Sequence, residues 1–270
     1  MTSSRRRFAE VVRAEPIDLG LACLLVGGEV DRSLDVDASL AMLDGLAATA
    51  AVPRVGVAAM AEGLRVALAD FAGGPEDYED LRSSLLPAVL RRRRGLPLLL
   101  SVVWLEVAAR LDVPAYAVAL PGHIVVGIGD AEDEHVLVDP FAGGRVLPPA
   151  AVEERVRQAT GASALPSMLA PVPPADLLLR LLTNIRALTA RQPPSLDVSR
   201  TRLWAVELSL LLPRHPLELR RERGELLVRL GAHLDGAEEL ETYAMAVDDV
   251  DSAAAGVARR EARLARAQLN

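Results

Sequence analysis

The stretch from Ala115 to Gly144, AYAVALPGHIVVGIGDAEDEHVLVDPFAGG, decides the fold of this chain. Its apolar and β-branched runs alternate with turn residues, a pattern typical of antiparallel strands. We expect strands at residues 115–120, 123–128 and 135–139, followed by a short one at 145–147. The polar residues 130–134 predict the hairpin loop between the second strand and the third.

The same stretch predicts a histidine–aspartate pair. A loop centred near position 132 places Asp139 opposite Val125, so that His123 is its diagonal neighbour. Both positions are odd-numbered, so both side chains leave the same face of the sheet, ~7 Å apart at the backbone. Asp139 could orient the His123 ring, as in a nucleophilic triad. The alternative is a purely structural hydrogen bond in a half-buried sheet.

A buried helix is expected just before these strands. Residues 98–111 are apolar on nearly all sides, and Pro97 suits the first turn because its missing N–H would have no partner there. A cysteine at such a helix start would be activated by the helix dipole. Pro97 occupies that place, so the predicted pair has no thiol beside it.

For the other residues that could act as nucleophiles, the sequence context indicates structural roles. Ser101 fits a small packing residue of the buried helix better than a nucleophile, and Ser83 and Ser84 are interpreted as helix caps. Cys23 is the only cysteine and lies in an apolar helical stretch, which favours a buried side chain over a reactive thiol. One cysteine permits neither an intramolecular disulfide nor a zinc site of several thiolates, and we expect no metal and no cofactor.

Charge and hydropathy limit the classes of partner and the location that we expect for this protein. The 270 residues carry a net charge of −7, and the pI near 5.3 argues against nucleic acid as the main partner. The run Arg91–Arg94 could meet an acidic partner or a phosphate, but we favour a solvated helix end. The longest apolar stretch, 96–105, is short of the ~20 residues of a membrane span, and no apolar run follows the N-terminal arginines. We therefore expect a soluble, cytoplasmic protein without a membrane partner.

Three parts are predicted along the chain. Residues 1–160 form the first domain, helical over 1–94 and with its core at 95–160. Residues 161–175, rich in Pro, Ala and Ser, form a linker. Residues 176–270 form a helical domain with one unit of about 34 residues that follows a tetratricopeptide pattern. Because such repeats normally stack in threes or more, this domain either offers a peptide groove or simply packs on the first domain.

An ordered set of short motifs carries a family resemblance over most of the chain. It includes Glu76-Asp77-Tyr78, Gly95-Leu96-Pro97, Leu120-Pro121-Gly122-His123, Asp139-Pro140-Phe141, Gly143-Gly144-Arg145, Leu181-Leu182-Thr183-Asn184 and Arg221-Glu222-Arg223-Gly224. Together they resemble the SirB-type transglutaminase-like family of bacterial proteins.

The resemblance implies an α+β fold. Its papain-like core would set a buried helix against an antiparallel sheet, between an N-terminal helical part and a C-terminal tetratricopeptide-like tail. It also implies the general histidine and aspartate positions for His123 and Asp139, and a family in which proline commonly replaces the cysteine. Ser83, where relatives tend to carry asparagine, and Leu85, where an aromatic residue is common, depart from the pattern.

Two functions follow as hypotheses. The first is a non-catalytic transglutaminase-like protein, without classical transglutaminase or cysteine protease activity, that acts through contacts with a protein partner. The alternative is a thiol-independent hydrolase or acyltransferase acting on amide or ester bonds. In that enzyme His123 would be the general base and Asp139 its orienter.

Overall fold

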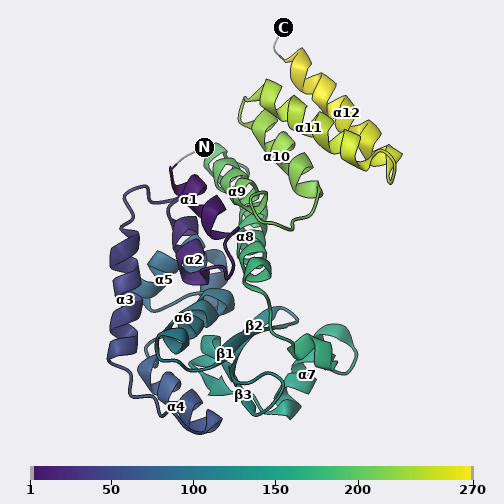
Figure 1. The fold of residues 1–270 in the computed structure, drawn as a ribbon. Helices are drawn as coiled ribbons and strands as arrows, with labels where there is room; N and C mark the ends of the chain where they lie inside the picture. The colour runs from purple at the N-terminus through teal and green to yellow at the C-terminus, as the bar shows by residue number, and fades with distance from the viewer. Residues whose placement is uncertain (1–2, 269–270) are drawn as a thin grey trace.

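The computed structural model describes residues 3–268, and Figure 1 shows the fold. Within this range the chain forms twelve α-helices and a single four-stranded sheet, so the predicted α+β class is confirmed. None of the described helices is both long and apolar enough to cross a membrane.

The sheet is an antiparallel meander in the order β1-β2-β3-β4. Its strands are β1 (Ala115–Leu120), β2 (His123–Gly129), β3 (His135–Asp139) and β4 (Arg145–Val146). The predicted strands are thus confirmed to within a residue. Val126 pairs with Val138 and Gly127 with Leu137, which is the register that the hairpin loop predicted.

Helices cover both faces of the sheet. On one face, Ala117, Ile124 and Val126 join the main core together with α6 (Pro97–Arg110). On the other, strand residues pack against Val152 and Val156 of α7 (Pro149–Thr160). Every residue of β2 is buried as a result. The sequence pattern predicted α6, starting at Pro97, but not α7.

The N-terminal helices wrap around α6. They are α1 (Ser3–Val11), α2 (Leu19–Gly27), α3 (Val36–Ala48), α4 (Val57–Ala67) and α5 (Leu86–Arg92). Between α4 and α5 lie two 3₁₀ turns, η1 (Pro75–Glu79) and η2 (Leu81–Ser84). Asp35 caps α3 by accepting a hydrogen bond from the Ala38 N–H, as a residue of this type does at a helix start.

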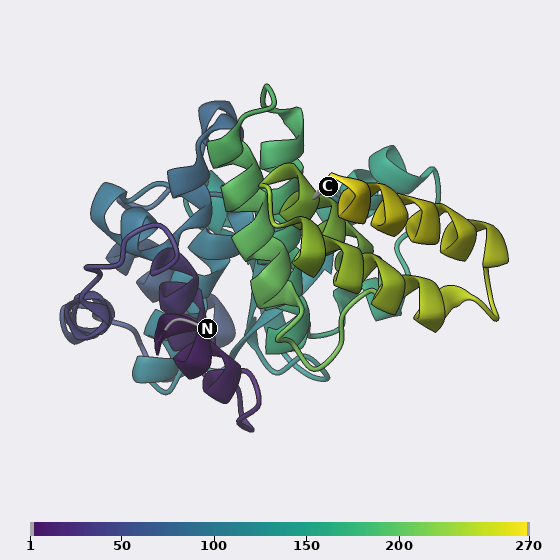
Figure 2. The same ribbon diagram turned by 90° about the horizontal axis from the view of Figure 1, so that it is seen from above.

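The first two C-terminal helices belong to the main core. In both ribbon views α8 (Pro174–Arg191) and α9 (Leu196–Ser209) lie between the N-terminal helices and the last three helices (Figure 1, Figure 2). Leu178, Leu181 and Leu182 of α8 and Leu208 of α9 share one apolar cluster with α6. The helical part after the Pro-rich stretch is therefore packed on the sheet-bearing part.

The Pro-rich stretch 161–175 is tied to the sheet. The Val172 N–H donates to the Ala117 carbonyl over 2.9 Å, and a 3₁₀ turn, η4 (Pro166–Leu169), also lies in the stretch. A separate domain beginning at residue 176 stays a prediction.

The last three helices pack against one another in sequence order. They are α10 (Glu218–Arg229), α11 (His233–Val247) and α12 (Ser252–Ala267). Gly224 of α10 lies so close to α11 that an added Cβ would be 2.7 Å from Leu240 Cγ. Ala258 and Ala262 bury the face of α12 that meets α11.

Candidate functional site

His123 and Asp139 contact each other at the edge of the sheet where β2 begins and β3 ends. His123 Nε2 lies 2.9 Å from Asp139 Oδ1, and the two residues are only 7% and 2% exposed. The Phe141 N–H also donates to Oδ1, over 3.0 Å. The predicted contact is therefore present, and the turn after β3 holds the carboxylate in place.

The surroundings of Asp139 favour its charged form. Burial alone would raise the pKa of this carboxyl group. The hydrogen bond and charge of His123, the Ala142 N–H and the charge of Arg155 outweigh burial and hold the pKa of Asp139 below its ordinary value. Asp139 is thus an ionised hydrogen-bond acceptor that can orient the imidazole ring.

We expect Asp139→Asn to change how stability depends on pH. With a folded pKa below the unfolded one, Asp139 stabilises the protein fully above the unfolded value of about 3.9, and this contribution disappears as pH falls through the folded value. Urea unfolding at several pH values should show a wild-type advantage over Asp139→Asn that shrinks below about pH 4. Parallel curves for the two proteins would contradict the depressed pKa.

The aromatic ring of Phe141 packs against the imidazole ring of His123. Its ring meets that of His123 edge-on, with centroids 5.9 Å apart, and meets Tyr78 in the same way at 5.8 Å. Gly73 makes room for it, since an added Cβ would lie 2.0 Å from Phe141 Cε2. Among the described residues, His123 Nδ1 has no hydrogen-bond partner, so this nitrogen is available to a ligand.

His123 lines a cavity of about 220 Å³. Pro97, at the first turn of α6, lines the same cavity, and helix α8 supplies its opposite wall. The lining residues are Tyr78, Ser84, Leu96, Pro97, Leu98, Gly122, His123, Ile124, Arg180, Asn184, Ala187, Leu188 and Arg191. We call this cavity the His123 pocket.

No thiol reaches the His123 pocket. Cys23 is 1% exposed within α2, where burial in the main core raises the pKa of its thiol. Ser101 donates to the Ile124 carbonyl over 3.4 Å, which makes it a packing link between α6 and β2. Both side chains have the structural positions that their sequence context predicted.

The comparison with protein-family models decides the family. A model described as transglutaminase-like superfamily matches residues 36–183, which is more than half of the chain and includes α6, the sheet and the first part of α8. The chain belongs to the transglutaminase-like superfamily. Pro97 is the first residue of α6 and lines the same cavity as His123.

Bacterial relatives agree with this family. A UPF0162 protein of Xylella fastidiosa is 34% identical over 178 residues, which cover 64% of this chain and 62% of the relative. A UPF0162 protein of Pseudomonas aeruginosa is 38% identical over 108 residues, which cover 40% and 39% of the two chains. The chain thus matches less than two thirds of the length of these relatives.

One solved structure, described as menin with the binding site for Mixed Lineage Leukemia (MLL) protein, aligns with 90% of this chain and 69% of its own. The TM-score is 0.45 and the sequence identity 10%, a likeness too low to indicate anything about function.

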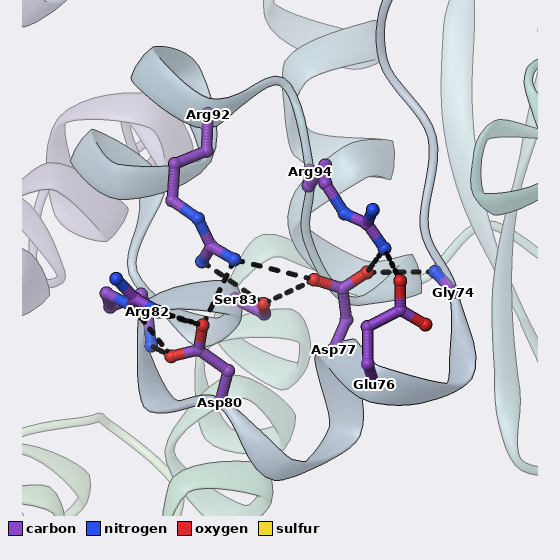
Figure 3. Close-up of polar contacts among 8 residues, drawn as sticks. All are labelled: Gly74, Glu76, Asp77, Asp80, Arg82, Ser83, Arg92 and Arg94. Carbon is purple, nitrogen blue, oxygen red and sulfur yellow. Dashed lines mark hydrogen bonds and ion pairs between the residues drawn. The ribbon is translucent and has the colours of Figure 1, made fainter.

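A charged network closes the loop that brings Tyr78 and Ser84 to the pocket of this transglutaminase-like domain. Figure 3 shows Asp77 at its centre. The carboxylate accepts hydrogen bonds from Ser83 Oγ at 2.7 Å, the Gly74 N–H at 2.8 Å and Arg94 Nη2 at 3.1 Å. Burial alone would raise the pKa of Asp77, but these bonds and the charge of Arg94 hold it below its ordinary value.

The run Arg91–Arg94 lies at the C-terminal end of α5, as predicted, with Arg91 and Arg94 exposed. Arg92 and Arg94 also pair with Asp77, Asp80 and Glu76 of the same chain, which the sequence did not indicate.

The prediction that Ser83 and Ser84 cap this helix was wrong. The N-cap of α5 is Leu85, and the Ser83 hydroxyl donates to Asp77. The error arises because Ser83 and Asp77 meet only once the loop folds back on itself.

Removing the carboxylate at the centre of this network is expected to destabilise the protein. Asp77→Ala leaves the Ser83 hydroxyl and the Gly74 N–H without their acceptor, which should lower the free energy of unfolding by about 2 kcal/mol. Asp70→Ala is the matched control, since the Asp70 side chain is 83% exposed and such surface pairs contribute little. Equal urea midpoints for the two variants would refute the structural importance of Asp77.

Within residues 3–268, no group of three or more His, Cys, Asp or Glu side chains is placed to hold a metal ion. Ser84, Asn184 and Arg180 line the His123 pocket but were not recognised from the sequence as parts of one site. Ser84 was noticed only as a helix cap, and the motif containing Asn184 only as part of the family resemblance.

Proposed function

We propose that this chain is a non-catalytic, SirB-type transglutaminase-like protein that binds a partner protein in the His123 pocket. The observation that carries the proposal is Pro97 at the first turn of α6, beside His123 in one cavity. Proline has no group that can attack a carbonyl carbon, whereas the His123–Asp139 pair and the cavity are both present. The site thus has a cavity that can bind a ligand but no cysteine thiol to act as a nucleophile.

A peptide segment fits the form of the pocket. Its volume of about 220 Å³ is below the ~300–1,000 Å³ of sites that enclose a drug-sized ligand. A single side chain or the end of a peptide fits better than a whole cofactor. Helix α8, which forms one wall of the pocket, packs on the sheet-bearing part. A ligand in the pocket would therefore contact α8 and the sheet-bearing part at once.

A test for catalysis compares the wild-type chain with His123→Ala. We expect both proteins to release the same background of p-nitrophenol from p-nitrophenyl acetate, and to incorporate no dansylcadaverine into casein. Turnover that is abolished by His123→Ala would overturn the non-catalytic assignment.

A test for partner binding selects a displayed peptide library on the full chain. Ala187 lines the pocket from an exposed position on α8, so Ala187→Trp should fill the mouth without disturbing the core. We expect the selected peptides to bind the wild-type chain and not Ala187→Trp. Selected peptides that bind both proteins equally well would place the binding surface elsewhere.

One observation favours a second candidate function. His123 Nδ1 has no hydrogen-bond partner among the described residues, and the ring lines the cavity. It could therefore take a proton from a water molecule that attacks an amide or ester. This hydrolase predicts turnover that requires His123 and Asp139 and that iodoacetamide does not inhibit.

A further inference from the structure

We propose that the His123 pocket recognises a carboxylate group carried on a short apolar chain, either a glutamate side chain or the C-terminus of a partner peptide. The inference rests on the proposed function, because it states which chemical group of the partner enters the pocket.

The first observation is a buried hydroxyl group without a partner. Ser84 is 1% exposed and lines the pocket, and its Oγ makes no hydrogen bond with any residue that the structure describes. A buried polar group normally has a partner, and leaving it unpaired costs stability. A ligand with an acceptor oxygen would supply the missing partner.

The second observation is unpaired positive charge at the mouth. Arg180 of α8 makes no ion pair or hydrogen bond with any described residue, whereas Arg186 of the same helix is paired with Glu222. Arg191 also lines the pocket, and within residues 3–268 it donates a single hydrogen bond, to the Tyr78 carbonyl over 3.2 Å. None of the described lining residues is acidic, so the opening favours a negatively charged ligand.

The third observation is the start of α6. The N-cap residue, Leu96, makes no side-chain capping bond, and the N–H groups of Leu98 and Leu99 have no acceptor within a helix that begins at Pro97. The positive end of the dipole of this 14-residue helix also lies at its N-terminus, beside the pocket. Such N–H groups bind carboxylates and other anions.

The apolar walls indicate which kind of chemical group bears the negative charge of the ligand. Leu96, Ile124 and Leu188 give the cavity apolar sides, while the polar groups stand at its buried end and its mouth. A carboxylate on a short hydrocarbon chain matches both kinds of surface.

The test measures fluorescence anisotropy with four labelled peptides on the full chain. One carries an internal glutamate and a C-terminal amide, and its partner carries glutamine instead. The other two end in leucine, one with a free carboxylate and one as the amide. We expect the glutamate peptide, the free C-terminus, or both, to bind about tenfold more tightly than the neutral counterpart. The two pairs thus tell a side-chain carboxylate from a terminal one.

Variants identify the groups responsible. Arg180→Gln and Ser84→Ala should each weaken carboxylate binding about tenfold. The matched controls are Arg229→Gln, at an exposed arginine of α10, and Ser209→Ala, at a buried serine of α9; both should bind like the wild-type chain. Because the Ser84 hydroxyl has no partner, Ser84→Ala should unfold at the wild-type temperature or above it, which separates its binding effect from a loss of structure.

Equal binding of charged and neutral peptides would overturn the inference, as would carboxylate binding unchanged in both Arg180→Gln and Ser84→Ala. Displacement of the peptide by equimolar inorganic phosphate would also overturn it, because the pocket would then be a phosphate site. Neutral peptides that bind the wild-type chain but not Ala187→Trp would leave the proposed function standing while this inference fails.

Discussion

Replacing Pro97 by cysteine is expected to create a thiol that reacts rapidly with iodoacetamide below neutral pH. The introduced thiol would stand at the first turn of α6 and line the same pocket as His123. A helix N-terminus and a neighbouring imidazole lower thiol pKa values from about 8.5 into the range of about 3.5–7.5. Near pH 6 the introduced thiol should therefore alkylate at least about tenfold faster than a free cysteine.

The chain contains its own control for this experiment. Cys23 is buried in α2 and burial raises the pKa of its thiol, so the wild-type protein should resist alkylation under the same conditions. Mass spectrometry of digested protein over a pH series identifies which cysteine has reacted. Adding His123→Ala to Pro97→Cys should shift the reaction toward higher pH. A rate profile like that of free cysteine would show that Pro97 does not occupy a thiol-activating position.

Removing residues 171–270 is expected to abolish the cooperative fold. Leu178, Leu181, Leu182 and Leu208 lie in the main core, and each contributes about 1.5–3 kcal/mol when fully buried. Their loss amounts to about 6–12 kcal/mol, which is comparable with the whole stability of a typical domain, about 5–15 kcal/mol. The fragment 1–170 should bind a hydrophobic dye, aggregate and melt without a sharp transition.

A fragment that ends at Arg214 keeps α8 and α9 and provides the matched comparison. It should melt sharply, because it keeps the main core and loses from α9 only the small cluster of Val206 with Leu219 and Leu226 of α10. If the fragment 1–170 melts as sharply as the whole chain, the helices after the Pro-rich stretch form an independent domain. The picture of one fused core would then be wrong.

The sheet and the His123–Asp139 contact could be predicted from the sequence because both depend on local rules. Side chains in strands alternate between the two faces, and a short loop between two strands sets their register. The loop before His135 therefore places Asp139 within reach of His123 without reference to any distant residue. Pro97 was likewise recognisable as the first residue of a helix, since proline is favoured at that position.

Other parts of the candidate site depend on segments that are far apart in the sequence. The guanidinium of Arg191 donates to the carbonyl of Tyr78, and Asp77 pairs with Arg92 at the end of α5 and with Arg94 just after it. Helix α7 shows no strong apolar pattern of its own, and its two buried valines gain significance only against the second face of the sheet.

The sequence by itself thus determined the strands, their register and the absence of a cysteine beside His123. Only the tertiary structure brought Ser84, Arg180 and Asn184 around one cavity. The physical reason is that periodicity and turn chemistry act over a few residues, whereas a pocket is formed where buried surfaces from distant segments meet. No local pattern encodes which hydroxyl group or arginine is left without a partner at such a meeting place.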